Sequence, residues 1–164
     1  MKRIMGIAAA AAAAFVTAGA LSHSALAQEK SAKAAKAMSA EAKRGRYLVQ
    51  TAGCNDCHTP GYAPNESRVD EKLWLTGDAL GWRGPWGTTY PANLRLVAAS
   101  MTEDQWVVRA KSPQLRPPMP WFNLRDMTPR DLKSIYAYLR YMGPAGEPAP
   151  AYVPPDKTPA GPFV

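Results

Sequence analysis

Cysteine and histidine are scarce in this chain of 164 residues, which contains two of each. The two cysteines, Cys54 and Cys57, are so close in sequence that a disulfide between them would close a very short loop and stabilise the fold little. His58 directly follows Cys57, and the other histidine, His23, lies in the alanine-rich N-terminal part. The thiols and the one remaining imidazole are therefore gathered in a single pentapeptide, and this grouping requires a chemical explanation.

The chain also lacks the patterns of a β-protein or a repeat protein. No stretch alternates Val or Ile convincingly with polar residues, no segment is repeated, and no charge block exceeds a few residues. Helix signals are present instead, each consisting of a capping residue followed by apolar residues at helical spacing. They predict helices from Ser39 to about Gln50, from Thr102 to about Lys111, and from Thr128 to about Met142. The fold class we predict is all-α, with few helices and much irregular structure.

The N-terminus has the pattern of an export signal. A basic start, Met1 to Arg3, precedes an apolar run to Leu21, and Ala25-Leu26-Ala27 matches a small-x-small cleavage site. We expect residues 1–27 to be a signal peptide cleaved after Ala27, which places the protein in the periplasm. The alternative is a membrane anchor, since the run is about long enough to span a bilayer, although alanine is only weakly apolar. Cleavage removes Lys2 and Arg3 and no acidic residue, so the net charge falls from +7 to +5.

The remaining chain is predicted to have three parts. Residues 28–38 form a flexible polar segment, and residues 39–142 form one domain. Residues 143–164 contain 7 prolines in 22 positions, so this tail is expected to be extended and to form neither helix nor sheet. Within the domain, the segment from Thr59 to Ala99 is rich in Gly, Pro and Trp, and we expect irregular structure there, with a short helical turn as the one regular element it could hold. A loop of that length is uncommon in a compact domain unless something organises it.

Cys54, Cys57 and His58 stand at i, i+3 and i+4, so on a helical turn they share one face. The C-x-x-C-H pattern is the signature of covalent haem attachment, in which each thiol adds to a vinyl group and the histidine binds the iron. One alternative is a thiol redox pair, which normally sits in a βαβ unit that this chain lacks. Another is zinc, which would need carboxylates to complete four ligands. A single haem c is the cofactor we expect, and its apolar surface would supply a core for the long irregular segment.

With one histidine left after cleavage, a second iron ligand within the chain would be methionine, and a His/Met pair raises the reduction potential. Met119 lies between prolines in Pro117 to Pro120, in a stiff non-helical loop suited to holding one side chain at a metal. Met101 and Met127 each precede a predicted helix cap and are expected to pack, whereas Met38 lies in the flexible segment and Met142 ends the last helix.

These features resemble the class I, monohaem c-type cytochromes of the bacterial periplasm. The resemblance lies in a helix just before C-x-x-C-H, a methionine in a proline-containing loop, and the block "MPWFNLRDMTPRDLKSIYAYLR" leading into a last helix. It covers about Ser39 to Met142 and implies thioether attachment at Cys54 and Cys57, His58 as proximal ligand and Met119 as distal ligand. It also implies that Gly45, with Tyr47 or Leu48, packs against Tyr138 and Leu139 where the end helices cross.

The resemblance leaves the partner of the His58 ring open. Many class I members have a proline about a dozen residues after the haem histidine, whose carbonyl orients the imidazole, and this chain reads Val69-Asp70-Glu71 there. A hydrogen-bond acceptor for His58 is nevertheless expected. Six side chains are candidates for contact with the haem propionates: Trp82, Trp86, Tyr90, Asn93, Arg95 and Arg116. The alternative role is packing on the cofactor wall for the tryptophans, a turn for Asn93 and charged surface for the two arginines.

The function we expect is transfer of single electrons between redox partners, with no substrate site and no enzymatic activity. Basic residues early in the mature chain favour partners with acidic docking surfaces, unless they are only a solvated face; they are Lys30, Lys33, Lys36, Lys43, Arg44 and Arg46. The alternatives are a dedicated electron-accepting subunit of a periplasmic dehydrogenase and a gas-binding sensor with Met119 absent from the iron. For the subunit, the tail would be a docking strap, unless it only wraps its own domain. A nucleic-acid partner and stable membrane insertion after cleavage are not expected.

Overall fold

A computed structural model describes residues 37–112 and 115–164. Contacts divide the chain into Met1–Ala37 and Met38–Val164, and the account below concerns the second unit. The expected signal peptide, residues 1–27, and nearly all of the expected flexible segment, residues 28–38, lie outside the described residues. Within the described part of the chain, no helix is long and apolar enough to cross a membrane.

The first and last helices of the unit form its main packing pair. Helix α2, Ala40–Thr51, begins where Ser39 Oγ accepts the Ala42 N–H at 3.1 Å, and α7, Pro129–Met142, begins where Thr128 accepts the Asp131 N–H. Both predicted helices are confirmed, with their caps. They cross at Gly45, where an added Cβ would overlap the backbone carbonyl of Ser134, so only glycine permits the close approach.

Two expectations about this crossing have different outcomes. Tyr138 and Leu139 are buried at it, and Leu48 is half-buried against the same core. Tyr47 is 61% exposed and takes no part, because its position on α2 faces away from α7. The core surrounds the helix pair and includes these buried apolar residues: Ala42, Val49, Tyr62, Trp74, Leu75, Ala98, Trp106, Leu132, Ile135, Tyr138 and Leu139.

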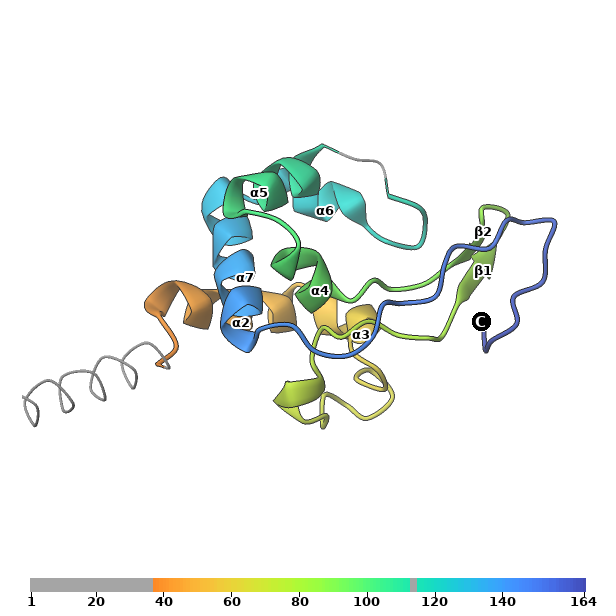
Figure 1. Cartoon of the computed structure of the whole chain (residues 1–164), viewed down its shortest axis with the longest axis horizontal. Helices are drawn as coiled ribbons and strands as arrows, with labels where there is room; N and C mark the ends of the chain where they lie inside the picture. Colours follow the sequence, from red (N-terminus) through yellow and green to blue (C-terminus); the bar gives the residue numbers. More distant parts are fainter. Residues whose placement is uncertain (1–36, 113–114) are drawn as a thin grey trace, which may run out of the picture. The chain divides into compact units, whose positions relative to one another are not determined.

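Between the end helices lie shorter elements (Figure 1). Helix α3 is Cys54–His58, η1 is a 3₁₀ turn over Glu71–Leu73, α4 is Leu94–Ala99, α5 is Glu103–Lys111 and α6 is Trp121–Asp126. Helix α5 was predicted, and its expected capping box between Thr102 and Gln105 is present. Helices α4 and α6 were not predicted, because six residues are too few to show a helical period. The Trp106 indole N–H donates to the Leu132 carbonyl at 2.9 Å and joins α5 to α7.

A small hairpin corrects the expectation that the chain has no strand; residues 59–99 also contain the short helical elements η1 and α4. Strands β1, Trp82–Gly84, and β2, Gly87–Thr89, pair antiparallel across Pro85 and Trp86. Strands of three residues show no alternation that a sequence pattern could reveal. The described residues are nevertheless mostly helical with long irregular loops, which is compatible with the all-α prediction.

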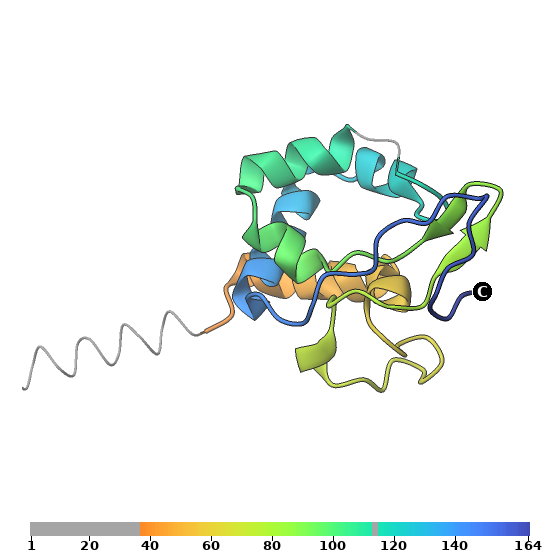
Figure 2. The ribbon, with the colours of Figure 1, turned by 45° about the vertical axis from the view of Figure 1, so that its right-hand side comes forward.

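The proline-rich tail, residues 143–164, is extended as expected, but it also pairs with this hairpin. Thr88 and Val153 exchange both backbone hydrogen bonds, at 2.7 and 3.0 Å, and Gly81 bridges Phe163. A proline-rich segment can still form isolated bridges, because each bridge uses the backbone N–H of a residue that is not proline, such as Val153. Both views show the tail running from the end of α7 to the hairpin (Figures 1 and 2).

Candidate cofactor site

The pentapeptide from Cys54 to His58 forms one helical turn, α3, so both thiols and the imidazole stand at positions i, i+3 and i+4 of a single turn. Gly53 precedes it with a φ of +73°, which permits the sharp entry from α2. Buried Thr59 fixes the far end, since its hydroxyl donates to Asn55 Oδ1 and accepts the Leu75 N–H, each at 2.8 Å. The turn is thus anchored to the core by polar contacts away from the sulfurs.

The two thiols are not joined, and their surroundings disfavour the thiolate form. Burial raises the pKa of Cys54 to about 11 and also raises the pKa of Cys57. Cysteines of thiol redox pairs have the opposite property, a lowered pKa that makes the attacking thiolate available near neutral pH. The environment therefore argues against the thiol redox alternative.

His58 is 8% exposed, and within residues 37–112 and 115–164 its ring has one polar partner. Nδ1 lies 2.7 Å from the carbonyl oxygen of Ala92. A carbonyl oxygen only accepts, so Nδ1 carries the proton and donates it, and the lone pair is left on Nε2. Burial lowers the pKa of His58, which keeps the ring neutral and able to bind a metal.

Ala92 is the acceptor that the sequence left unnamed. It is 34 residues from His58, and a backbone carbonyl leaves no trace in the amino-acid type. Pro91 directly precedes it, so a proline does lie beside the acceptor, but far beyond the dozen residues at which the family pattern places it. Such a partner fixes ring orientation, which is the role expected for it.

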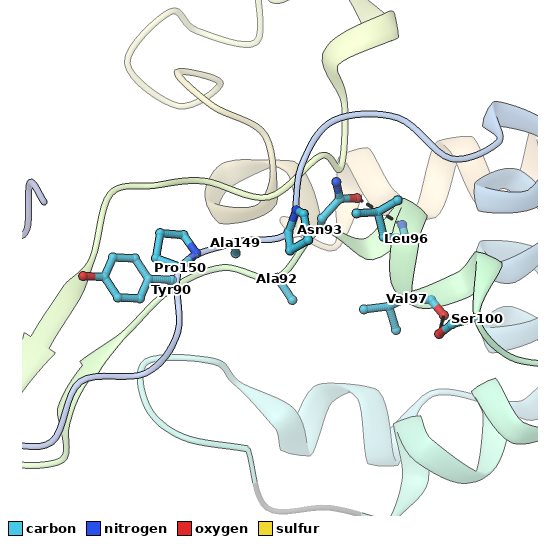
Figure 3. Close-up of a pocket in the computed structure, with 9 residues that line it drawn as sticks. Tyr90, Ala92, Asn93, Leu96, Val97, Ser100, Ala149 and Pro150 are labelled. Carbon is cyan, nitrogen blue, oxygen red and sulfur yellow. Dashed lines mark hydrogen bonds between the residues drawn. The ribbon is translucent and has the colours of Figure 1, made fainter.

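A cavity of about 380 Å³ adjoins this site. Ala92 links the two, since it lines the cavity and also holds His58 through its carbonyl. Figure 3 shows that α4, the segment before it and the tail supply the wall. The lining residues are Tyr90, Ala92, Asn93, Leu96, Val97, Ser100, Pro148, Ala149 and Pro150. Its wall is mostly apolar, and Cys54, Cys57, His58 and Met119 are not among the residues that form it.

Asn93 and Arg95, two of the residues expected to contact the propionates, form hydrogen bonds to protein atoms instead. Asn93 caps α4 by accepting the Arg95 and Leu96 N–H groups, and it donates to tail carbonyls at Ala145 and Glu147. Arg95 is 6% exposed and donates to the carbonyls of Lys72, Met142 and Gly143. Asn93 therefore takes the turn role given as its alternative. Arg95 proves to be a buried tether rather than charged surface.

Trp86 differs from these, because its buried indole N–H has no hydrogen-bond partner in the described part of the chain. The hydroxyl of neighbouring Thr89 is also buried without a partner there. An unsatisfied buried donor costs about 1–3 kcal/mol, so such atoms point to a group that the polypeptide itself does not supply. Contact between Trp86 and a haem propionate stays a prediction that this unpaired N–H leaves open.

Met119 lies in the loop Leu115–Pro120, just before α6. It is half-buried, and its carbonyl accepts the Trp121 N–H at 2.8 Å. It differs from Met101 and Met127, which pack against the core as expected, and from Met38 and Met142, which also pack there. Met119 is absent from that packing, and its place at an iron stays a prediction.

The described residues give the zinc alternative no ligand set. No group of three or more His, Cys, Asp or Glu side chains within residues 37–112 and 115–164 could hold a metal ion. Haem needs no such group, because its porphyrin supplies four of the ligands to the iron.

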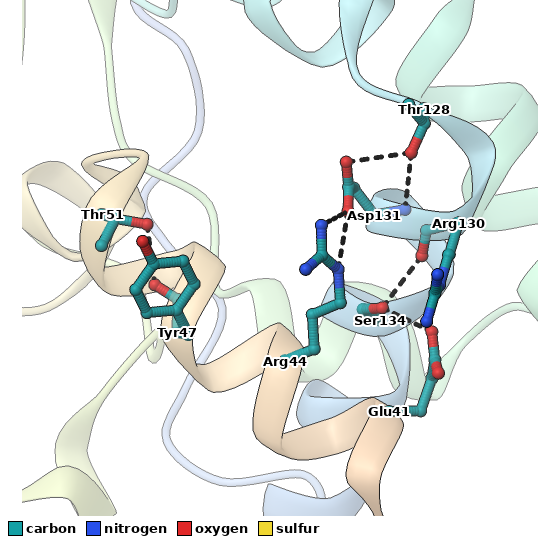
Figure 4. Close-up of polar contacts among 8 residues, drawn as sticks. All are labelled: Glu41, Arg44, Tyr47, Thr51, Thr128, Arg130, Asp131 and Ser134. Atoms are coloured by element: carbon teal, nitrogen blue, oxygen red, sulfur yellow. Dashed lines mark hydrogen bonds and ion pairs between the residues drawn. The ribbon is translucent and has the colours of Figure 1, made fainter.

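Two of the basic residues expected to form a docking surface, Arg44 and Arg46, are paired with carboxylates. Arg44 pairs with Asp131 on α7, as Figure 4 shows, and Arg46 donates to both carboxylate oxygens of Glu71 at 2.8 and 2.9 Å. These pairs tie α2 to its neighbours and weaken the case for these two arginines as a docking surface. The other basic residues expected there are exposed Lys43 and three that lie outside the described residues: Lys30, Lys33 and Lys36.

Comparison with known proteins supports a cytochrome. The chain is 30% identical over 118 residues to the fructose dehydrogenase cytochrome subunit of Gluconobacter japonicus. The match covers 65% of this chain and 22% of that subunit, so the chain spans only about a fifth of its relative. No protein-family model matches the chain. No solved structure matches it significantly. The relative is described as a cytochrome subunit, which is consistent with the C-x-x-C-H turn of this chain.

Proposed function

We propose that this chain is an exported monohaem c-type cytochrome that accepts single electrons from a dehydrogenase as its partner subunit. One observation carries the proposal: the C-x-x-C-H turn holds a neutral His58 whose Nδ1 is bound by Ala92 and whose Nε2 is left for a metal. The relative, itself a dehydrogenase cytochrome subunit, favours the subunit role over a freely diffusing carrier.

The residues have separate tasks. Cys54 and Cys57 would hold haem c through two thioether bonds, and His58 and Met119 would be the two ligands that the protein supplies to the iron. When bound, the haem supplies a one-electron redox couple. Because the protein only keeps both ligands in place and excludes water, no substrate site and no protein acid or base are needed.

The chain's own contacts explain how the site stays rigid while the charge changes. Thr59 anchors α3 to Asn55 and Leu75, and Ala92 prevents the His58 ring from rotating. Ligands held in one orientation need little rearrangement when an electron arrives. The hydrogen bond from His58 Nδ1–H to a carbonyl also raises the basicity of Nε2, which makes it a stronger ligand for a metal.

The test is the optical spectrum of the protein exported from a host that attaches haem c. A six-coordinate protein should show the weak far-red sulfur–iron band when oxidised and should not bind carbon monoxide when reduced. Met119→Ala should lose the band and bind carbon monoxide, whereas the control Met101→Leu, in a core-packed methionine, should behave as wild type. A band that survives in Met119→Ala would remove this residue from the iron and assign the ligand elsewhere.

A second candidate, a gas-binding sensor, is tested by the same spectra. Rapid carbon monoxide binding by the wild-type protein, with no sulfur–iron band, would favour it. The subunit role is tested separately by purification of the protein from the native cells. Stable co-elution with a larger dehydrogenase supports this role, and elution of the cytochrome as a monomer contradicts it.

A further inference from the structure

The tail, residues 143–164, is held to its own domain at both ends. At its start, Asn93 donates to the carbonyls of Ala145 and Glu147 at 2.8 and 3.1 Å. Near its end, Arg83 donates to the Lys157 carbonyl at 2.8 Å and lies over the Phe163 ring. A segment fixed on both sides presents the residues between these points in defined positions.

Tyr152 is the residue that this arrangement places most firmly. Its hydroxyl donates to the Trp86 carbonyl at 2.8 Å, and the next residue, Val153, pairs with Thr88 of β2. Gly87 has a φ of +96°, and a Cβ there would meet the Tyr152 ring at 2.8 Å, so the ring lies directly against the hairpin backbone. The aromatic face of Tyr152 is thus a fixed platform.

The partner on that platform is Arg116. Its guanidinium carbon lies 3.9 Å from the centroid of the Tyr152 ring, the shortest such distance in the described part of the chain. Arg116 belongs to the loop Leu115–Pro120, in which three of six residues are prolines and lack a backbone N–H. With few donors of its own, the loop depends on side-chain contacts for its position.

We propose that Tyr152 is a positioning residue: through Arg116 it holds the loop that carries Met119, so the tail is an intramolecular strap over the sixth-ligand loop. The inference rests on the proposed function, in which Met119 is the distal ligand. Met119 follows Arg116 by three residues, and its own carbonyl accepts the Trp121 N–H at the start of α6. The loop is therefore secured on either side of Met119, by the stack with Tyr152 and by α6.

This role differs from docking to a partner. A strap that is already engaged on its own domain keeps the distal ligand in place in the isolated protein. Loss of the stack frees the loop at one end and raises the fraction of time during which an added ligand can replace the methionine sulfur.

The experiment measures imidazole binding to the oxidised protein, followed through loss of the sulfur–iron band. Tyr152→Leu removes the aromatic face, Tyr152→Phe keeps it and removes the hydroxyl, and Tyr47→Leu removes an exposed tyrosine remote from the tail. A cation–π contact at a partly exposed site predicts about a two- to fivefold rise in imidazole affinity for Tyr152→Leu. Tyr152→Phe should stay closer to wild type, and Tyr47→Leu should not differ from it.

Two further readouts separate positioning from general damage. Hydrogen exchange should quicken in the 115–121 peptide of Tyr152→Leu and stay unchanged in the α2–α7 peptides. Arg116→Gln should reproduce the rise, and the double variant should add little to either single one, because both remove the same contact.

The outcomes distinguish this inference from the function on which it rests. A wild-type protein without the sulfur–iron band overturns ligation by Met119 and the positioning role with it. A wild-type protein with the band, together with Tyr152→Leu of unchanged imidazole affinity and unchanged loop exchange, overturns the strap alone.

Discussion

Replacement of Asn93 tests how the wall of the site is joined to the tail. The side chain is 2% exposed and makes four hydrogen bonds: it accepts the Arg95 and Leu96 N–H groups at 3.1 Å and donates to the carbonyls of Ala145 and Glu147. Asn93→Ala loses all four, whereas Asn93→Asp keeps the acceptors and loses both donors. The pair of variants therefore separates the helix cap from the attachment of the tail.

The structure sets the expected magnitudes. Loss of a helix cap costs about 1 kcal/mol, and each lost hydrogen bond to a tail carbonyl costs about 1 kcal/mol. Asn93→Ala should thus lower the free energy of unfolding by about 3 kcal/mol, and Asn93→Asp by about 2 kcal/mol or more, since a carboxylate would also face two carbonyl oxygens.

Urea denaturation of the haem-loaded protein measures both values, and limited proteolysis reports release of the tail. Asn65→Ala is the control, because Asn65 is exposed and bonds only to the nearby Gly61 carbonyl, so its loss should change stability by less than about 0.5 kcal/mol. If Asn93→Asp unfolds at the wild-type urea concentration and its tail stays resistant to protease, the tail contacts contribute no stability and the reasoning fails.

Two other predictions concern the packing of the end helices. Gly45→Ala should destabilise the protein by about 1–3 kcal/mol, because the overlap with the Ser134 carbonyl outweighs the better helix propensity of alanine; Gly161→Ala, which meets nothing closer than 4.0 Å, should be nearly neutral in the same urea assay. The hydrogen bond from Arg46 lowers the pKa of Glu71 below its ordinary 4.5, so this carboxylate adds stability above that pH and loses it as the pH falls through the lowered value. Glu71→Gln should therefore have a lower thermal midpoint than wild type at pH 7 and approach it in acid; an equal deficit at both pH values would contradict the assignment.

Local signals account for what could be predicted. A helix end depends on a few neighbouring residues, so Ser39, Thr102 and Thr128 marked the starts of α2, α5 and α7 correctly. The spacing of Cys54, Cys57 and His58 likewise needs only one helical turn to bring them together. Elements of six residues or fewer, such as α4, α6 and the strands of the hairpin, repeat their period too few times to give a comparable signal.

The sequence by itself determined which groups are available for chemistry, because two thiols and an imidazole can share one face only at such spacing. Tertiary structure alone decided what surrounds them. Ala92 holds His58 through a backbone carbonyl that any residue type would offer. The side-chain amide of Asn93 was a candidate for contact with a haem propionate, but it donates instead to a carbonyl of the tail, 52 residues away. Partners of this kind are chosen by the path of the chain in space, and no local pattern records that path.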